Sequence, residues 1–275
     1  MTTRAGSGHP SSSLSTIDIL TALYFGGIMR YDPRRPAWAD RDRFIMSKGH
    51  AAPALYAALA EAGYFPADML GTLRRTGSPV EGHPNMLVLP GVEASTGSLG
   101  QGLSIGLGHA LAARVDGRDF RVYVMLGDGE SEEGQVWEAA MAAAKYATAN
   151  LTAILDSNEF QQTGPVQTVM PSLEPLKAKW TSFGWDVSET GGHDIDCIMD
   201  ALGALSRATG RGRPQMVIAH TLKGKGLSPF EKDEINRKHG VPLTAEEART
   251  ALAELDRMYG GPGASDGPGA SGGEE

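Results

Sequence analysis

The stretch Arg121-Val122-Tyr123-Val124-Met125-Leu126-Gly127-Asp128-Gly129 decides the fold of this chain. Its apolar, β-rich run predicts a buried strand, and the Gly-Asp-Gly that follows predicts a turn into a helix. A second such run, Leu151 to Ser157, ends directly before Asn158. Strands joined through a crossover helix lie parallel, so we expect Asp128 and Asn158 side by side at the carboxyl edge of one sheet, where open α/β sheets bind ligands.

Asp128 and Asn158 together offer a carboxylate and a carboxamide oxygen, which Mg²⁺ accepts as ligands alongside water and phosphate oxygens. Gly127 and Gly129 let backbone amides approach a diphosphate, and the start of the next helix favours negative charge. A lone Gly-Asp-Gly is more often a simple turn. The strand before it, the helix after it and the Asn at the end of the next strand favour a magnesium-diphosphate site.

Helical patterns alternate with short apolar runs along the chain. Helices are expected at 16–26, 51–62, 67–75, 99–115, 133–148, 195–208 and 245–258, and strands at 121–126, 151–156, 185–189 and 215–220. This alternation predicts an α/β fold in which a parallel sheet carries helices on both faces. We expect residues 1–259 to form one domain and the Gly/Pro/Ser-rich residues 260–275 to form a disordered tail. Ser15 and Thr244 are expected to open their helices as capping boxes.

The composition argues against several classes of protein. A formal net charge of −8 without a Lys/Arg cluster argues against a nucleic-acid partner. The single cysteine, Cys197, excludes a disulfide scaffold, fits a reducing cytoplasm and is expected in a helix core. No apolar run approaches the roughly 18 residues that cross a bilayer, and residues 1–9 lack a signal-peptide layout. We expect a soluble, cytoplasmic protein without a membrane partner.

Three histidines follow glycines in predicted loops: His9, His50 and His83. A single loop histidine is by default solvated, but three beside a diphosphate-type site predict a polar cleft that handles hydroxyl and phosphate groups near pH 7. Their spacing does not predict a zinc site. The glycine-rich segment Ser95–Gly102 precedes a helix, and it either meets an anion through its amides or permits close helix packing.

Seven motifs occur in one order along the chain. They are Ala5-Gly6-Ser7-Gly8-His9-Pro10, Asp40-Arg41-Asp42-Arg43-Phe44, Ser47-Lys48-Gly49-His50, Gly82-His83-Pro84, Ser95-Thr96-Gly97-Ser98-Leu99-Gly100-Gln101-Gly102, Gly127-Asp128-Gly129 and Lys223-Gly224-Lys225-Gly226. This set resembles the thiamine-diphosphate-binding amino-terminal part of transketolase over about residues 5–243. The fold that the resemblance implies is the diphosphate-type domain of thiamine enzymes.

The resemblance implies roles for individual residues. Asp128, Asn158 and the backbone carbonyl of Phe160 would hold Mg²⁺, or another divalent cation such as Ca²⁺ or Mn²⁺. His9, His50 and His83 would be catalytic residues that face the thiazolium and the sugar donor. The residues implied to bind thiamine diphosphate are Gly97, Ser98, Leu99, Gly127, Asp128, Gly129, Glu133, Asn158, Phe160, Lys223 and His239.

The chain also departs from the family pattern. Full-length transketolases continue into a pyrimidine-binding domain and a third domain, which supply the glutamate for the aminopyrimidine ring and the arginines for the substrate phosphate. Nothing here corresponds to those domains, so the resemblance implies one subunit of a split enzyme, paired with a companion C-terminal subunit in an α2β2 heterotetramer. Glu133 and Glu138 would lie near that companion, whereas the residues alone favour a solvated helix face. Ser11-Ser12 and Asn236 replace the usual glycines and histidine, and the amino terminus is short.

The implied reaction is transfer of a two-carbon ketol unit from a ketose donor to an aldehyde acceptor. One alternative is the alpha subunit of a split 2-oxo acid dehydrogenase, although Gly-His-Pro and Ser-Lys-Gly-His favour transketolase. Another alternative is a non-catalytic, cofactor-binding scaffold, against which the intact pair Asp128 and Asn158 argues.

Overall fold

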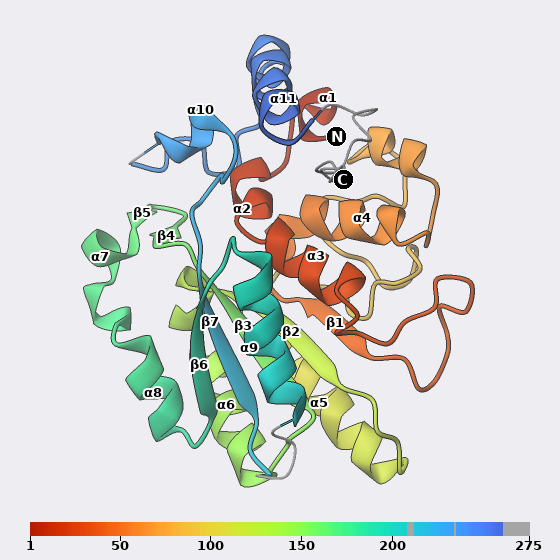
Figure 1. The fold of residues 1–275 in the computed structure, drawn as a ribbon, viewed down its shortest axis with the longest axis vertical. Coiled ribbons are helices and arrows are strands. Elements are labelled where there is room, and N and C mark those ends of the chain that lie inside the picture. Colours follow the sequence, from red (N-terminus) through yellow and green to blue (C-terminus); the bar gives the residue numbers. More distant parts are fainter. Residues whose placement is uncertain (208–211, 234, 261–275) are drawn as a thin grey trace, which may run out of the picture.

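The core of the molecule is a five-stranded sheet in which every neighbouring pair is parallel (Figure 1). The computed structural model describes residues 1–207, 212–233 and 235–260. The strands in sheet order are β1 (Arg43–Met46), β2 (Val122–Gly127), β3 (Leu151–Ser157), β7 (Gln215–His220) and β6 (Asp186–Gly191). This sheet confirms the predicted α/β class, and four of its strands lie where the apolar runs predicted them.

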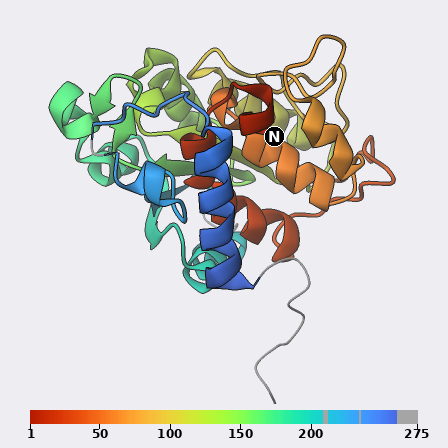
Figure 2. The same cartoon turned by 90° about the horizontal axis from the view of Figure 1, so that it is seen from above.

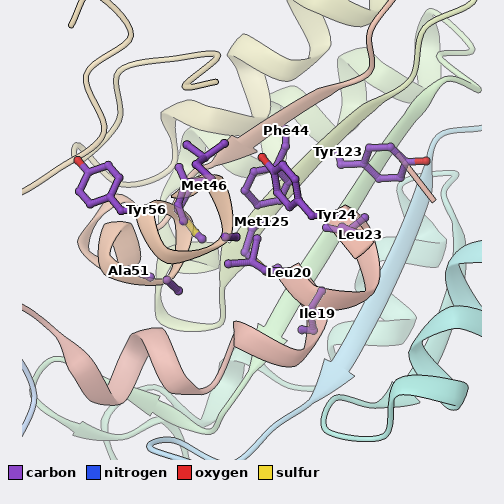
Figure 3. Close-up of a cluster of buried hydrophobic side chains, with 14 of the residues drawn as sticks. Ile19, Leu20, Leu23, Tyr24, Phe44, Met46, Ala51, Tyr56, Tyr123 and Met125 are labelled. Atoms are coloured by element: carbon purple, nitrogen blue, oxygen red, sulfur yellow. The ribbon is translucent and has the colours of Figure 1, made fainter. Parts of the chain in front are cut away.

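Helices cover both faces of this sheet, because alternate strand residues enter different cores. On one face Phe44, Met46, Tyr123 and Met125 pack with α3 (Ile17–Phe25), α4 (Ala52–Glu61) and α9 (Ile195–Arg207), as Figure 3 shows for α3 and α4. On the other face Ile45, Val122, Val124 and Leu126 pack with α5 (Gln101–Val115), α6 (Gly134–Lys145) and α8 (Leu176–Ser182). The central strands are therefore largely apolar, as a doubly covered parallel sheet requires.

Short elements and one long helix complete the fold. In Figure 2 the helix α11 (Ala245–Tyr259) crosses the molecule near α1 (Thr2–Ala5) and α2 (Pro10–Leu14). Its capping box on Thr244 and Glu247 is present as predicted. The remaining elements are η1 (Gly49–Ala51), η2 (Ala67–Thr72), η3 (Gly129–Glu132), η4 (Pro171–Leu173), α7 (Val166–Val169), α10 (Ser228–Glu231), β4 (Phe160–Gln161) and β5 (Gly164–Pro165).

Several expectations about local structure were wrong. The strand β1 was not predicted, because its four residues include Arg43 and form too short an apolar run to be distinguished. The helix expected at 67–75 is the 3₁₀ helix η2. Ser15 does not cap α3: its hydroxyl donates to Ser12 O and to Asp156 Oδ2, a tertiary partner that the local sequence does not reveal.

Cys197 is exposed, not buried. It lies on α9 directly before Ile198, and Ile198 and Leu202 are the residues that this helix turns toward the core. The prediction that Cys197 lies in the core was therefore wrong, because the helical pattern alone did not show which face of the helix carries the cysteine. The tail predicted at 260–275 lies, from residue 261 onward, outside the described residues.

The parallel arrangement brings the carboxyl ends of β1, β2, β3 and β7 to one edge of the sheet. The residues that directly follow these four strands are Ser47-Lys48, Asp128, Asn158 and Thr221. Each belongs to a segment that was predicted from the sequence to be functional, or lies next to such a segment. Within the described residues, no helix is long and apolar enough to cross a membrane.

We expect the packing of α5 on β2 to tolerate no side chain at Gly106. A Cβ built there would lie 2.4 Å from Val124 Cγ2, whereas one at the exposed Gly108, two residues along the same helix, meets nothing within 4 Å. Gly106→Ala should lower the free energy of unfolding by about 1–3 kcal/mol through overpacking. Gly108→Ala should raise it by up to about 1 kcal/mol through helix propensity. Urea unfolding of both variants checks this, and equal effects would contradict the packing argument.

Candidate active site

Asp128 lies at the carboxyl end of β2, beside the end of β3, where the strand register pairs Gly127 with Asp156. Its side chain is buried, and its Oδ1 accepts a hydrogen bond of 2.7 Å from the Gly129 amide. Its Oδ2 is also buried and has no well-aligned hydrogen-bond partner within residues 1–207, 212–233 and 235–260. Burial, and then the nearby charge of Asp156, raise the pKa of Asp128 to about 7. A buried carboxylate oxygen without a partner is costly unless a cation or proton joins it.

Asp156 is the hydrogen-bonding centre of this edge, and it is fully buried. It accepts from Ser15 Oγ at 2.6 Å, from Asn158 Nδ2 at 2.9 Å, and from Lys48 Nζ and Thr221 Oγ1. Burial alone would raise the pKa of Asp156, but the charge of Lys48 and these hydrogen bonds outweigh it and hold the pKa below its usual value. The charged carboxylate thus fixes Asn158, whose Oδ1 accepts from the Phe160 amide at 3.1 Å.

A cavity of about 340 Å³ opens against Asp128 and collects most of the predicted site residues. Its walls contain eleven residues that the sequence nominated, among them all three glycine-flanked histidines. These eleven are His9, His50, His83, Gly97, Leu99, Gly127, Asp128, Gly129, Asn158, Phe160 and His239. Segments more than 200 residues apart in the chain therefore meet in one cavity.

Three of the histidines form a compact group inside this cavity. The ring centroid of His9 lies 5.1 Å from that of His50 and 5.2 Å from that of His239, and the last two are 5.6 Å apart. The fourth histidine of the cavity, His83, packs against Gly97, where an added Cβ would lie 3.0 Å from the ring. These contacts support a shared cleft rather than separately solvated loop histidines.

Burial keeps these imidazoles neutral at pH 7. Burial, and then the charge of Arg74, lower the pKa of His9 to about 4 and lower that of His83 as well. Burial and the charge of Lys223 lower the pKa of His239 to about 3, and burial with Lys48 lowers that of His50 well below its usual value. A neutral imidazole both donates and accepts a hydrogen bond, as an alcohol partner requires.

Lys223 is buried next to the cavity, with its Nζ 2.8 Å from His239 Nδ1 and 5.7 Å from the centroid of the Phe160 ring. Burial, and then the charge of Lys48, lower the pKa of Lys223 to about 8. Lys48 is paired with Asp156, whereas Lys223 makes no ion pair within the described residues. The charge of Lys223 is therefore the one that suits an anionic ligand.

The glycine-rich segment permits close packing, as its sequence allowed, and it also reaches the cavity; contact of its amides with an anion stays a prediction. Gly97 lines the cavity, whereas Gly102 packs so closely on the end of β1 that an added Cβ would lie 2.4 Å from Ser47 Cβ. The buried Glu130 joins these parts, because its carboxylate accepts from Ser47 Oγ, the Gly100 amide and the Gly127 amide. Burial raises the pKa of Glu130, which the three hydrogen bonds oppose.

A few nominated residues lie outside the cavity walls. Ser98, Glu133 and Glu138 are exposed, and their assignment to the cofactor or to a companion subunit stays a prediction. Asn236, in the place of a family histidine, is buried and donates from Nδ2 to Gln161 O at 2.6 Å. Asn236 thereby supports the loop that carries Phe160.

The sequence missed several residues that build the site. Ser12, Lys48, Glu130 and Gln161-Gln162-Thr163 line the cavity, and Asp156 organises its floor. Asp156 had a usable signal, since an acidic residue in an otherwise apolar strand must find a buried partner. The sequence signal for Lys48 was weaker, and consisted of its place in the motif Ser-Lys-Gly-His. The turn 161–163 had no sequence signal, because only the tertiary fold brings it to the cavity.

The residues fit a divalent cation and a diphosphate. Within the described residues, no group of three or more His, Cys, Asp or Glu side chains could hold a metal ion. An ion at Asp128 Oδ2 would therefore complete its ligands with amide, carbonyl and phosphate oxygens, as Mg²⁺ does at phosphate sites. Asp128 Oδ2, which has no well-aligned partner in the described part of the chain, suits the cation, and the charge of the buried Lys223 suits the diphosphate.

The raised pKa of Asp128 predicts how the metal-free chain responds to pH. Its folded pKa of about 7 exceeds the unfolded value of about 3.9, so the stability it contributes is fully present below about pH 4 and is lost as the pH rises to about 7. Asp128→Asn should therefore raise the free energy of unfolding at pH 8 by about 2–4 kcal/mol. Urea unfolding with a chelator at pH 5.5 and 8 measures this. The exposed Asp256, changed to Asn, is the control, and no gain at pH 8 for Asp128→Asn would contradict the assignment.

Known proteins are similar to this chain in sequence and in fold. The family described as "Transketolase, thiamine diphosphate binding domain" matches residues 1–259. The 6-deoxy-6-sulfo-D-fructose transketolase subunit SqwG of Clostridium sp. (strain MSTE9) is 45% identical over 254 residues, covering 92% of this chain and 90% of that protein. An apulose-4-phosphate transketolase subunit of Phocaeicola vulgatus is 44% identical over 252 residues, covering 92% of this chain and 87% of that protein.

Solved transketolases superimpose on the same region. A Pichia stipitis transketolase in complex with fructose 6-phosphate matches with a TM-score of 0.85 and 32% identity over 94% of this chain. Campylobacter jejuni transketolase matches with a TM-score of 0.84 and 31% identity, also over 94%. The matched region spans 38% and 40% of those two chains. The chain described here belongs to the transketolase family and contains that family's thiamine-diphosphate-binding α/β domain.

Proposed function

We propose that this chain is the diphosphate-binding subunit of a split, thiamine-diphosphate-dependent transketolase. With a companion subunit, it would transfer a two-carbon ketol unit from a ketose donor to an aldehyde acceptor. The observation that carries the proposal is the buried Oδ2 of Asp128, which has no well-aligned partner among the described residues and lies in the wall of a cavity that also contains four neutral histidines. The Asp128 part of this cavity suits a metal-bound diphosphate, and the histidine group suits a polyhydroxylated substrate.

The share of each relative's length that this chain covers supports the split arrangement. This chain covers about nine tenths of two relatives that are themselves named as transketolase subunits, but only about two fifths of the solved transketolases. We therefore assign the pyrimidine-binding domain and its glutamate to a companion subunit, in an α2β2 assembly located in the cytoplasm. The exposed Glu133 and Glu138 and the segment 95–102 would face that companion.

We assign the metal to Asp128, Asn158 and the carbonyl of Phe160, with Mg²⁺ as the expected ion. Asp156 supports this assignment, because its hydrogen bond orients the Asn158 carboxamide. Lys48 and Lys223 would favour the negative charge of the diphosphate from the protein side. Ser98, Leu99 and the backbone at Gly97 and Gly129 would complete the cofactor contacts.

We assign the substrate end of the cavity to the histidine group. When bound, thiamine diphosphate supplies the carbanion-stabilising chemistry of ketol transfer. The chain's own part is to hold the donor hydroxyls and to exchange protons with them through His9, His50 and His83. These imidazoles are neutral and line one cavity. His239 and the buried Lys223 would fix the position of this group.

Cofactor binding should depend on the Asp128 carboxylate. Asp128→Ala should abolish thiamine diphosphate binding in the presence of Mg²⁺ while the chain stays folded, because loss of a charged ligand costs several kcal/mol. Calorimetry of the reconstituted complex measures the affinity, and circular dichroism verifies the fold. Asp256→Ala is the matched control with unchanged affinity. Wild-type affinity in a folded Asp128→Ala variant would exclude the site.

The purified chain should be inactive by itself. The glutamate that draws off the cofactor proton belongs, in this proposal, to the companion subunit, so ketol transfer should appear only when the two are mixed. Size-exclusion chromatography with an activity assay, on the single chain and on the mixture, tests this. We expect a complex containing two copies of each subunit. Ketol transfer by the single chain would refute the split arrangement.

A further inference from the structure

Arg74 occupies an unusual position between two of the histidine-bearing loops. It follows η2 and has a positive φ of 58°, a conformation that residues other than glycine rarely adopt. The surrounding loop holds it there: its amide donates to Val80 O at 2.9 Å, and the Thr72 and Ser78 hydroxyls are 2.7 Å apart. A strained backbone that is fixed so firmly is typical of residues whose side chain has a required direction.

The guanidinium of Arg74 bridges the two loops. Its Nη1 donates to Ser7 Oγ at 3.0 Å, two residues before His9, and its Nη2 donates to Gly82 O at 3.4 Å, one residue before His83. It lies so close over Gly82 that an added Cβ would come within 2.8 Å of Arg74 Cζ. A planar group with donors in fixed directions suits such a two-sided contact better than a single ammonium.

We propose that Arg74 is a positioning residue for the transketolase reaction, holding the His9 and His83 loops at a fixed separation across the mouth of the cavity. The proposal rests on the proposed function for its catalytic consequence. None of the seven motifs contains Arg74, so it is the folded chain that points to this role.

Electrostatics support the same geometry. After burial, the charge of Arg74 is the strongest influence that lowers the pKa of both His9 and His83. The other groups that face His9 are Lys48 and His50 from the end of β1, His83, Lys223 after β7, and His239. Replacing Arg74 removes none of these groups, so a change in the titration of His9 reports the loss of the Arg74 charge together with the shift of the loops that Arg74 held.

Four variants separate the contributions of Arg74. Arg74→Ala removes the bridge and the charge and keeps the backbone strain, whereas Arg74→Gly removes the strain as well. Arg74→Lys keeps the charge but cannot bridge both loops. Arg75→Ala is the control, because Arg75 is the next residue and is exposed as Arg74 is, but its side chain makes no hydrogen bond or ion pair within the described residues. Turnover is measured with the companion subunit, and the titration of His9 and His83 is followed by NMR on the full chain.

We expect Arg74→Ala and Arg74→Gly each to lower turnover by about 10- to 100-fold, the usual effect of displacing catalytic groups by about 1 Å. The pKa values of His9 and His83 should rise in both variants, which moves the acid limb of the pH–rate profile to higher pH. Arg74→Gly should unfold at a higher temperature than Arg74→Ala and still be as slow. Arg74→Lys should keep the low pKa values without regaining turnover, and Arg75→Ala should match the wild type.

Unchanged titration of both histidines in Arg74→Ala would overturn the proposal, as would wild-type turnover in Arg74→Gly or full rescue by Arg74→Lys. Absence of ketol transfer in the wild-type pair would instead refute the proposed function. The NMR titration and the unfolding temperatures do not depend on that activity, so they still decide whether Arg74 links the two loops.

Discussion

The buried carboxylate of Asp156 is the contact on which the rest of the site depends. It binds Lys48 from the end of β1, Asn158 from the end of β3, Thr221 after β7 and Ser15 before α3. Four segments are therefore fixed at one edge of the sheet by a single charged group. A buried ion pair of this kind adds little net stability compared with an apolar pair, but it specifies one arrangement because a charge left unpaired inside the protein is costly.

This arrangement leaves the neighbouring Asp128 poorly stabilised as a charged group. Lys48 is engaged by Asp156, so the Asp128 carboxylate keeps one oxygen without a well-aligned partner in the described residues. The metal-free protein bears this cost, and a bound cation would relieve it. Stability given up at a site in order to gain ligand affinity is a common compromise in enzymes.

Burial and shared positive charge also explain the histidine group. His9, His50 and His239 lie within 5.6 Å of one another between ring centroids, with Lys48 and Lys223 nearby. Each cation lowers the pKa of the imidazoles, so the group stays neutral and can exchange protons with neutral hydroxyls. The positive charge of these lysines also suits an anion, so one region of the fold combines groups suited to a phosphate with neutral imidazoles suited to hydroxyl groups.

The sequence by itself predicted the parallel α/β class and four of the five strands, and its local motifs together with the family resemblance nominated eleven of the residues that line the cavity. Apolar periodicity reports burial directly, and glycine and histidine in turns report their local chemistry. Only the tertiary structure decided the partners of Ser15, the exposed face of Cys197, the role of Asp156 and the reach of Arg74 between two loops. These features depend on contacts between segments distant in the chain, and local sequence carries no information about the partner of a side chain until the sheet brings the two together.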